Sequence, residues 1–406
     1  MFRLKKRIAL LCLTVLAVFV VLGFQNARCE VSNKALEQRI ENIERRLEST
    51  ENTVEKTLTE SGVLGKLSLG GLIAGAGQYQ SVDDAPGFNN TGRGAVLFQP
   101  EIGFALTDVD EVFTKFGFAA GNALNDGTMS PFTYSPWAAD LEDDVKGING
   151  RNRDYLLTAW YKHTFVFSEG NTLGVTGGII DATDYLDENA YANDEFTQFM
   201  NAALVNGPNG FFPSYDLGGA VEWEFGDFAL TGVGMNMGEN DDLRTHNFYG
   251  LTLDYAINTK LGEGHYRVTV DWTSEDFVSP EGDKIKSKRC AILSFDQPLG
   301  EILGAWLRFG WQDDAAAVNC KALYSGGFDI SGKLWGREQD NMGIGYAYLD
   351  GGNQDLDNAR VFETYVRFLL NRYVALTADL QYQDNKIKQQ DSPSGFISGV
   401  RCVVEF

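Results

Sequence analysis

Two tryptophans of this chain each stand two positions before a cationic residue: Trp160 precedes Lys162, and Trp306 precedes Arg308. On an extended strand, residues two apart project from the same face, so each ring and its neighbouring charge would lie side by side. A ring face accepts C–H groups, and a planar guanidinium donates paired hydrogen bonds to neighbouring oxygens. Each pair could therefore contact a polar solute, provided that its strand turns this face toward water.

Charged residues at alternate positions extend this pattern over much of the chain. They carry both signs and stand between apolar neighbours: Glu101, Lys115, Glu222, Arg267, Asp271, Glu363, Arg367 and Asp379. As a set, facing charges of opposite sign would fix the field and the width of a water-filled passage. Taken singly, each can equally be a solvated wall residue, or half of a cross-strand ion pair that only stiffens the sheet.

Strands must position these side chains, and the sequence from Gly65 to Phe406 has their period of two. In "HYRVTVDWTSED", from His265 to Asp276, charged and hydroxyl residues alternate with aromatic and β-branched ones. Such alternation predicts strands with one apolar and one polar face. It predicts about sixteen strands, which begin near residues 66, 93, 111, 152, 172, 217, 227, 244, 264, 286, 303, 320, 340, 359, 373 and 394.

The connections between these strands alternate in length. Short turns such as Thr107 to Glu111 and Lys260 to Gly264 alternate with the long links 123–151 and 181–216, so the long links lie at one end. That asymmetry is typical of outer-membrane barrels. The link from Ser331 to Gln339 is longer than this rule predicts.

The apolar face decides between a barrel and a sandwich. A sandwich of this size would leave four edge strands unprotected, whereas lipid admits only helices and closed barrels. We therefore expect an all-β transmembrane barrel of about sixteen antiparallel strands, wide enough for an aqueous channel. Aromatic residues on the outward face would form interfacial girdles: Trp223, Trp272, Trp311, Tyr249, Tyr266, Tyr346 and Tyr348.

The N-terminus predicts export. Basic residues from Arg3 to Arg7 precede the apolar run Ile8 to Phe24, and Ala27 and Cys29 offer a cleavage site, so residues 1–29 are predicted to be a signal peptide. An uncleaved membrane anchor is the alternative. After cleavage the chain keeps 29 basic and 56 acidic residues, a formal net charge of −27, against −22 for the whole chain. Such acidity disfavours nucleic acid as a partner.

Residues 30–62, between the signal and the predicted barrel at 63–406, have a different period. Apolar residues recur at alternating steps of four and three: Leu36, Ile40, Ile43, Leu47, Val54 and Leu58. This spacing predicts a short α-helical coiled coil in the periplasm, and hence an oligomer. The alternative is a single amphipathic helix that lies on the barrel mouth.

The link from Asp181 to Asp216 predicts a constriction. Asn193 is a candidate N-cap for an amphipathic helix, whose apolar stripe, which begins with Phe196 and Phe199, could pack on the inner wall. A loop folded inward in this way would narrow the channel. The acidic residues Asp181, Asp184, Asp187 and Glu188 belong to the same link, and they could instead bind calcium, although their spacing does not match an EF-hand.

Three segments resemble the carbohydrate-selective porins of Gram-negative outer membranes. They are "IIDATDYLDENAYANDEFTQFMNAALVN", "GGFDISGKLWGREQDNMGIGYAY" and the end of the chain from "FETYVRFLLNRYVALTADLQYQDN". The chain departs from the family's pattern at Ala378, where a proline is usual, in its acidic surface loops and in the added coiled coil. The resemblance implies an outer-membrane location, a single-chain barrel, passive passage of sugars and, as in many porins, a homotrimer.

The sequence leaves competing functions open. A net charge of −27 after cleavage suits a general or cation-preferring porin. The coiled coil suits a structural tether that contacts the cell wall. An enzyme is disfavoured, because the three histidines, His163, His246 and His265, lack a nucleophile motif. We expect no cofactor and no metal centre. Cys290 and Cys320 could pair, or they could be small apolar fillers.

Overall fold

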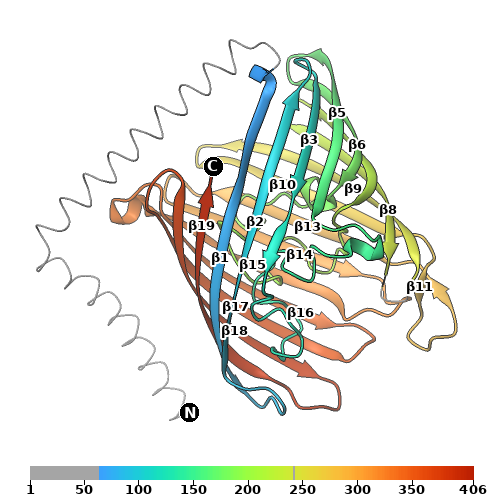
Figure 1. Ribbon diagram of the computed structural model, residues 1–406, viewed down its shortest axis with the longest axis vertical. Helices are drawn as coiled ribbons and strands as arrows, with labels where there is room; N and C mark the ends of the chain where they lie inside the picture. Colours follow the sequence, from blue (N-terminus) through green and yellow to red (C-terminus); the bar gives the residue numbers. More distant parts are fainter. Residues whose placement is uncertain (1–63, 241–242) are drawn as a thin grey trace, which may run out of the picture. The chain divides into compact units, whose positions relative to one another are not determined.

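A computed structural model describes residues 64–240 and 243–406 (Figure 1). The predicted signal peptide and coiled coil lie outside these residues. No helix in the described part of the chain has the length and apolar character needed to span a membrane. The described residues are dominated by one large antiparallel sheet.

The first half of the sheet begins after a 3₁₀ turn, η2 (Leu64–Lys66). Its strands are β1 (Leu67–Asp83), β2 (Thr91–Ala105), β3 (Asp110–Phe116), β4 (Phe118–Ala120), β5 (Leu156–Ser168), β6 (Asn171–Ile180), β7 (Asp216–Phe225), β8 (Phe228–Glu239) and β9 (Thr245–Thr259). Strands β3 and β4 form one spanning strand between β2 and β5, interrupted at Gly117. A Cβ at Gly117 would lie 2.8 Å from the Leu157 side chain, so glycine at the interruption leaves room for that side chain.

The second half continues the same sheet. Its strands are β10 (Gly262–Thr273), β13 (Arg289–Pro298), β14 (Leu303–Gln312), β15 (Cys320–Ser331), β16 (Asn341–Gly351), β17 (Leu356–Leu369), β18 (Val374–Ile387) and β19 (Ser394–Glu405). A small hairpin, β11 (Phe277–Val278) and β12 (Ile285–Lys286), belongs to the loop after β10. Strand β1 pairs with both β2 and β19, so the sheet closes. With β3 and β4 taken together, the barrel has the sixteen antiparallel strands predicted.

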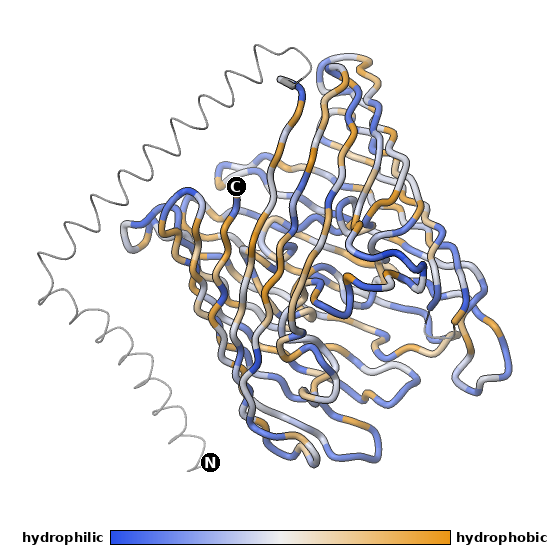
Figure 2. The backbone as a smooth tube through the Cα atoms, in the orientation of Figure 1, coloured by the Kyte–Doolittle hydropathy of each residue, from blue (hydrophilic) through white to orange (hydrophobic). Residues whose placement is uncertain are grey.

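Alternation along each strand separates the two faces of the barrel. On β17, Glu363 and Tyr365 point inward and are buried. Phe362, on the same strand, is exposed on the other face. On β18 the inward positions are Thr377, Asp379, Gln381 and their alternate neighbours. Figure 2 shows the same alternation of apolar and polar residues along the strands. The outward face therefore suits hydrocarbon and the inward face suits water, as an outer-membrane barrel requires.

Aromatic rings gather outside the barrel, as predicted. Trp223, Trp272, Trp311, Tyr249 and Tyr346 are all exposed. At the β7–β8 turn, outward rings contact one another in series: Trp223 is tilted against Phe225 at 4.7 Å, and Phe225 stacks on Phe228 at 5.7 Å and Phe228 on Tyr255 at 4.5 Å between ring centroids. Rings grouped at one end of the strands are what an interfacial girdle needs.

The long β15–β16 link contains a 3₁₀ turn, η5 (Gly332–Trp335). The Ser331 side chain accepts a hydrogen bond from the Lys333 N–H at its start, and buried Asp340 accepts one from the Leu369 N–H at 2.9 Å. Asp340 also pairs with Arg337. The link is therefore longer than a tight turn because it closes on itself around Asp340.

Candidate functional site

Residues 181–215, called here the inward loop, connect β6 to β7 and lie against the opposite inner wall. Arg308 on β14 forms an ion pair with Asp187 at 2.7 Å, and both side chains are fully buried. The same guanidinium donates to the carbonyls of Ala192 at 2.9 Å and Leu204 at 3.2 Å. A single arginine thus contacts three groups of the loop, one carboxylate and two carbonyls.

Two further wall charges hold the middle of the inward loop. The Glu363 carboxylate accepts hydrogen bonds from the N–H groups of Met200 at 2.5 Å and Asn201 at 2.9 Å. Arg401 on β19 donates to the carbonyls of Glu195 at 2.5 Å and Gln198 at 3.0 Å. These charged residues contact the loop backbone, so the wall fixes the position of the loop across the lumen.

The helix predicted within this loop is wrong, because residues 191–210 form a series of turns. Only isolated helical bonds occur, such as Gln198 N–H to the Asp194 carbonyl at 2.9 Å. Asp194, rather than Asn193, accepts the N–H groups of the following turn. Wall side chains take the backbone groups that a helix would bond internally. The predicted apolar stripe is nevertheless buried: Phe196, Phe199, Met200, Ala203 and Leu204.

The stripe packs on apolar residues of the wall and of the link between β4 and β5. The Phe199 ring meets Trp306 at 5.6 Å and Tyr365 at 5.2 Å between centroids, both edge to face. Phe196 meets Trp137 edge to face at 6.4 Å. Trp306 is 1% exposed. Its ring therefore contacts the loop, so the Trp306–Arg308 pair holds the loop and does not face open water.

A second inward loop, residues 121–155 between β4 and β5, was not predicted to fold inward. The Pro136 carbonyl accepts hydrogen bonds from Gln78 at 3.0 Å and Gln381 at 2.8 Å, which come from opposite ends of the chain. Trp137 is fully buried, and its indole N–H donates to the Glu195 carbonyl at 3.1 Å. The only sequence signals for this inward fold were the length of the link and the position of Trp137 next to a proline. The two loops therefore pack on each other as well as on the wall.

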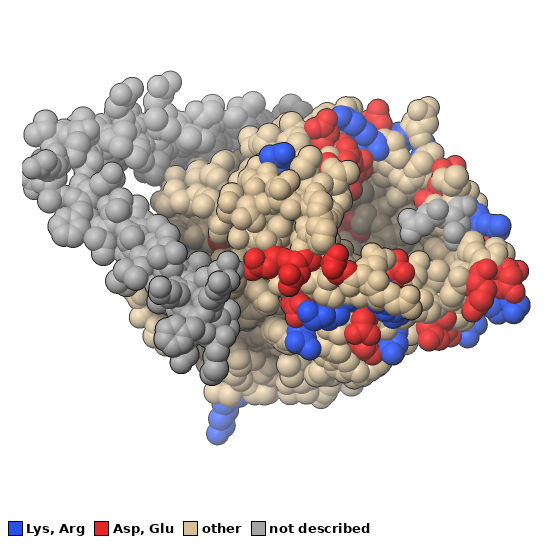
Figure 3. Space-filling model, turned by 90° about the horizontal axis from the view of Figure 1, so that it is seen from below, with Lys and Arg blue, Asp and Glu red and all other residues tan. Residues whose placement is uncertain are grey.

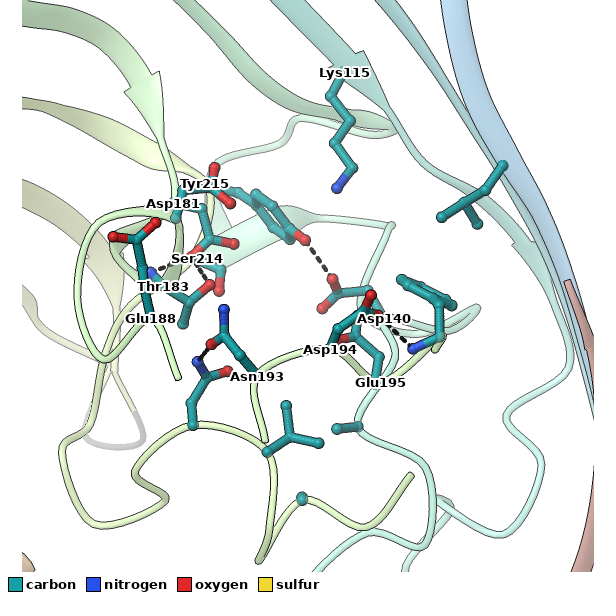
Figure 4. Close-up of a pocket in the computed structure, with 17 residues that line it drawn as sticks. Lys115, Asp140, Asp181, Thr183, Glu188, Asn193, Asp194, Glu195, Ser214 and Tyr215 are labelled. Carbon is teal, nitrogen blue, oxygen red and sulfur yellow. Dashed lines mark hydrogen bonds between the residues drawn. The ribbon is translucent and has the colours of Figure 1, made fainter. Parts of the chain in front are cut away.

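A cavity of about 460 Å³, called here the acidic cavity, remains between the two loops and the wall. Figure 4 shows the ammonium of Lys115, on β3, extending toward loop carboxylates. Six carboxyl groups line it: Asp140, Asp181, Asp184, Glu188, Asp194 and Glu195. Lys115 is the one cationic residue in the described lining. Its ammonium lies 4.0 Å from Glu101.

Burial changes the acidity of the loop carboxyls. Desolvation raises the pKa of Asp140 and of Asp184 to about 7, and the charge of Asp181 adds to the rise at Asp184. Desolvation also raises the pKa of Glu195 to about 8, with Asp194 adding to it. Tyr215 donates its hydroxyl hydrogen bond to Asp140 (Figure 4). The charge of the acidic cavity therefore changes near neutral pH.

The remaining candidate residues lie elsewhere on the inner wall. Lys162 pairs with Glu222 at 2.6 Å, and Trp160 stacks on Phe113 at 5.1 Å. Arg267 pairs with Asp254 at 3.3 Å and with Asp296. Three others are distributed along β10, β17 and β18: Asp271 is buried, Arg367 lines a second cavity, and Asp379 lies 2.9 Å from Gln381. The structure thus brings Lys115 together with the predicted loop residues Asp181, Asp184 and Phe196. It brings Arg308 to Asp187 and Trp306 to Phe199 at the attachment of the loop.

Two of the histidines lie beside aspartates, and the described cysteines do not form disulfides. His163 lies 2.7 Å from Asp110, and His265 lies 2.9 Å from Asp254. Cys290, Cys320 and Cys402 are free thiols, so the pairing of Cys290 with Cys320 is not formed. In the residues that the structure describes, no group of three or more side chains is arranged to hold a metal ion.

Comparison with known proteins identifies the family of this chain. Residues 137–406, which contain the inward loop and the strands β14, β17 and β19 that hold it, match the family model "Carbohydrate-selective porin, OprB family". The chain belongs to the OprB family of carbohydrate-selective porins. This porin is therefore a sugar channel and not an enzyme.

Individual relatives agree with that assignment. The porin is similar to an uncharacterized protein of Aquifex aeolicus, 30% identical over 318 residues that cover 77% of this chain and 87% of the other. It also resembles the high-pH structure of Pseudomonas putida OprB, with a TM-score of 0.65 and 15% identity, covering 87% and 97% of the two chains. The structure of the outer-membrane channel DcaP of Acinetobacter baumannii is similar with a TM-score of 0.51 and 9% identity, and the match covers 84% of this chain and 97% of the other. These two structures share the fold.

Proposed function

We propose that sugars cross the barrel through the acidic cavity, between the inward loop and the wall that carries Lys115. The observation that supports this most is the attachment of the inward loop to the far wall by Arg308, Glu363 and Arg401. A loop held on one side of the lumen confines the free passage to the other side. The acidic cavity lies there.

Most of the candidate residues then fall into three groups. Trp160, Lys162, Glu222, Glu101 and Lys115 belong to the β2–β7 side of the wall, where solute would pass. The residues that hold the loop act indirectly, because they set the width of the passage: Trp306, Arg308, Glu363 and Asp187. Asp181, Asp184 and Phe196 would form the loop side of the constriction.

Sugar influx into liposomes tests this proposal. The wild-type porin should admit D-glucose faster than tetraethylene glycol, a neutral solute of similar size with hydroxyls only at its ends. Lys115→Met should alter the glucose rate, because this ammonium extends into the proposed passage. Lys321→Met, which removes a half-exposed lysine paired with Asp350, serves as control. Equal rates for both solutes would contradict sugar preference.

A cation-preferring channel is the second candidate, and the lining of the acidic cavity favours it. Six carboxyls face one ammonium there. The face of the barrel in Figure 3 also shows acidic side chains beside a recess. Reversal potentials in a KCl gradient separate the two functions, since strong cation selectivity without block by glucose would favour the second.

The location and assembly of the chain are proposals as well. The family and the barrel fold imply the outer membrane of a Gram-negative bacterium. We propose that the heptad spacing within residues 30–62 forms a coiled coil that joins three copies and reaches the cell wall. Deletion of residues 31–60 should then convert a detergent-solubilised trimer into monomers, which sedimentation velocity would detect.

A further inference from the structure

A second cavity, of about 340 Å³, lies between the inward loop and the part of the wall next to the β15–β16 link, and it is named here the Tyr191 cavity. Loop residues including Tyr191, Thr197 and Gln198 form one side, and residues of β15, β16, β17 and the β15–β16 link form the other. Its volume falls within the range of small-molecule sites, about 300 to 1,000 Å³.

Arg367 supplies an uncommitted charged donor to this cavity. Its Nε is buried, and among the described residues the side chain has no hydrogen bond and no ion pair. This distinguishes it from Arg308, Arg401 and Arg267 on the same inner wall, each of which has partners. A guanidinium whose Nε is buried without a partner is costly unless a ligand or water takes that donor.

Acceptors and donors of the right kind surround Arg367. Asp329 lines the same cavity, and one of its carboxylate oxygens accepts from the Asn341 amide at 2.8 Å. Asn341 in turn donates to the Tyr365 hydroxyl at 3.1 Å, which fixes its amide. Guanidinium and carboxylate together can bind two adjacent hydroxyl groups, the first as donor and the second as acceptor.

Tyr191 contributes an aromatic face held in one place. Gly304 on β14 leaves room for the ring, since a Cβ there would collide with it. The Tyr191 N–H donates to the Asn189 side chain at 3.1 Å, and Asn189 donates to Ser294 at 3.2 Å. Burial raises the pKa of Tyr191 to about 12, so its hydroxyl remains a donor at physiological pH. A fixed ring can stack on the C–H face of a sugar without losing much conformational freedom.

We propose that the Tyr191 cavity is a binding subsite for a monosaccharide. Its pyranose ring stacks on Tyr191, and two neighbouring hydroxyls bind Arg367 and Asp329. The subsite rests on the proposed sugar passage, and it adds a binding step at the end of the barrel that carries the β15–β16 link.

Block of the ion current by D-glucose in planar bilayers tests the subsite. Arg367→Met should raise the half-blocking glucose concentration about tenfold, because a charged hydrogen bond is lost. Tyr191→Leu should raise it as well, through loss of the ring face. Arg367→Lys keeps the charge but not the paired donors, so its value should fall between wild type and Arg367→Met. Arg360→Met is the matched control: it lies on the same strand, is exposed and pairs only with Asp384, so block should not change.

The outcomes separate the subsite from the function on which it rests. If the wild-type channel admits glucose into liposomes, but glucose blocks the Arg367→Met and Tyr191→Leu channels as strongly as wild type, the subsite alone is overturned. A wild-type channel that admits no glucose overturns the proposed passage too. If Arg367→Met fails to fold, as heat-dependent electrophoretic mobility would show, the Arg367→Lys and Tyr191→Leu channels decide the result.

Discussion

Charged side chains of this barrel have two distinct uses. The first is to hold a loop against the wall, as Arg308 does. Its guanidinium and the Asp187 carboxylate have no exposure to solvent, although both belong to a lumen built from polar residues. Burial of two charges is favourable only when their geometry and additional hydrogen bonds compensate for the lost hydration. The carbonyls of Ala192 and Leu204 provide those additional bonds.

Removal of this arginine should release the inward loop. Arg308→Met leaves Asp187 buried without its partner, which costs about 3 to 5 kcal/mol for a pair of this kind. We expect a larger and noisier single-channel conductance in KCl. Lys333→Met, which breaks an exposed pair with Glu301, should leave conductance unchanged. A quiet channel of wild-type conductance in Arg308→Met would show that the ion pair does not hold the loop.

The second use of charge is to set the field of the acidic cavity. Each carboxyl is neutral below its pKa, so Asp140, Asp184 and Glu195 gain negative charge as the pH rises through about 7 to 8. Selectivity for K⁺ over Cl⁻, measured from reversal potentials, should therefore increase severalfold between pH 6 and 9. Glu195→Gln should reduce this increase.

A carboxyl on the second inward loop provides the control for that experiment. The hydrogen bond from Lys146 lowers the pKa of Glu142, which is therefore already ionised at pH 6. Glu142→Gln should leave the change between pH 6 and 9 as in wild type. A pH response that Glu195→Gln and Glu142→Gln diminish equally would exclude the acidic cavity as its source.

At the scale of elements, the second inward loop is as firmly attached as the first. Trp137→Ala should remove a buried indole at a cost of about 3 to 5 kcal/mol, and it should loosen both loops because Trp137 contacts Phe196 and Glu195. We expect a lower midpoint of thermal unfolding in detergent and increased conductance. Trp311→Ala truncates a tryptophan on the outer face and should not affect conductance. Unchanged conductance in Trp137→Ala would mean that residues 121–155 do not border the passage.

The sequence predicted strands better than loops for a physical reason. Each strand carries its own period of two, so Glu363 and Phe362 could be assigned to opposite faces without knowledge of their neighbours. The conformation of the inward loop depends instead on Glu363, Arg308 and Arg401, which lie more than a hundred residues away in sequence. Local capping and stripe signals therefore predicted a helix where distant side chains impose turns. For the same reason, the sequence predicted neither the inward fold of residues 121–155 nor the Tyr191 cavity.

At the scale of the whole molecule, closure of the sheet should decide stability. Deletion of residues 394–406 removes β19 and leaves the edges of β1 and β18 unpaired in lipid, which is strongly unfavourable. We expect no folded, heat-modifiable species on electrophoresis. Deletion of residues 31–60, which precede the barrel, should leave that species intact. A folded barrel without β19 would show that the remaining strands can close differently.

The order of pairing also has a consequence for how the protein folds. Apart from one contact, neighbouring strands in the sheet follow each other along the chain, so they can assemble hairpin by hairpin, and the longest links to close are residues 121–155 and 181–215. The exception joins β1 to β19, from Leu72 with Glu405 to Asp83 with Ser394. That seam has by far the greatest sequence separation, so its formation should be the slow, final event in assembly. The kinetics should accordingly show early gain of sheet followed by a late cooperative step.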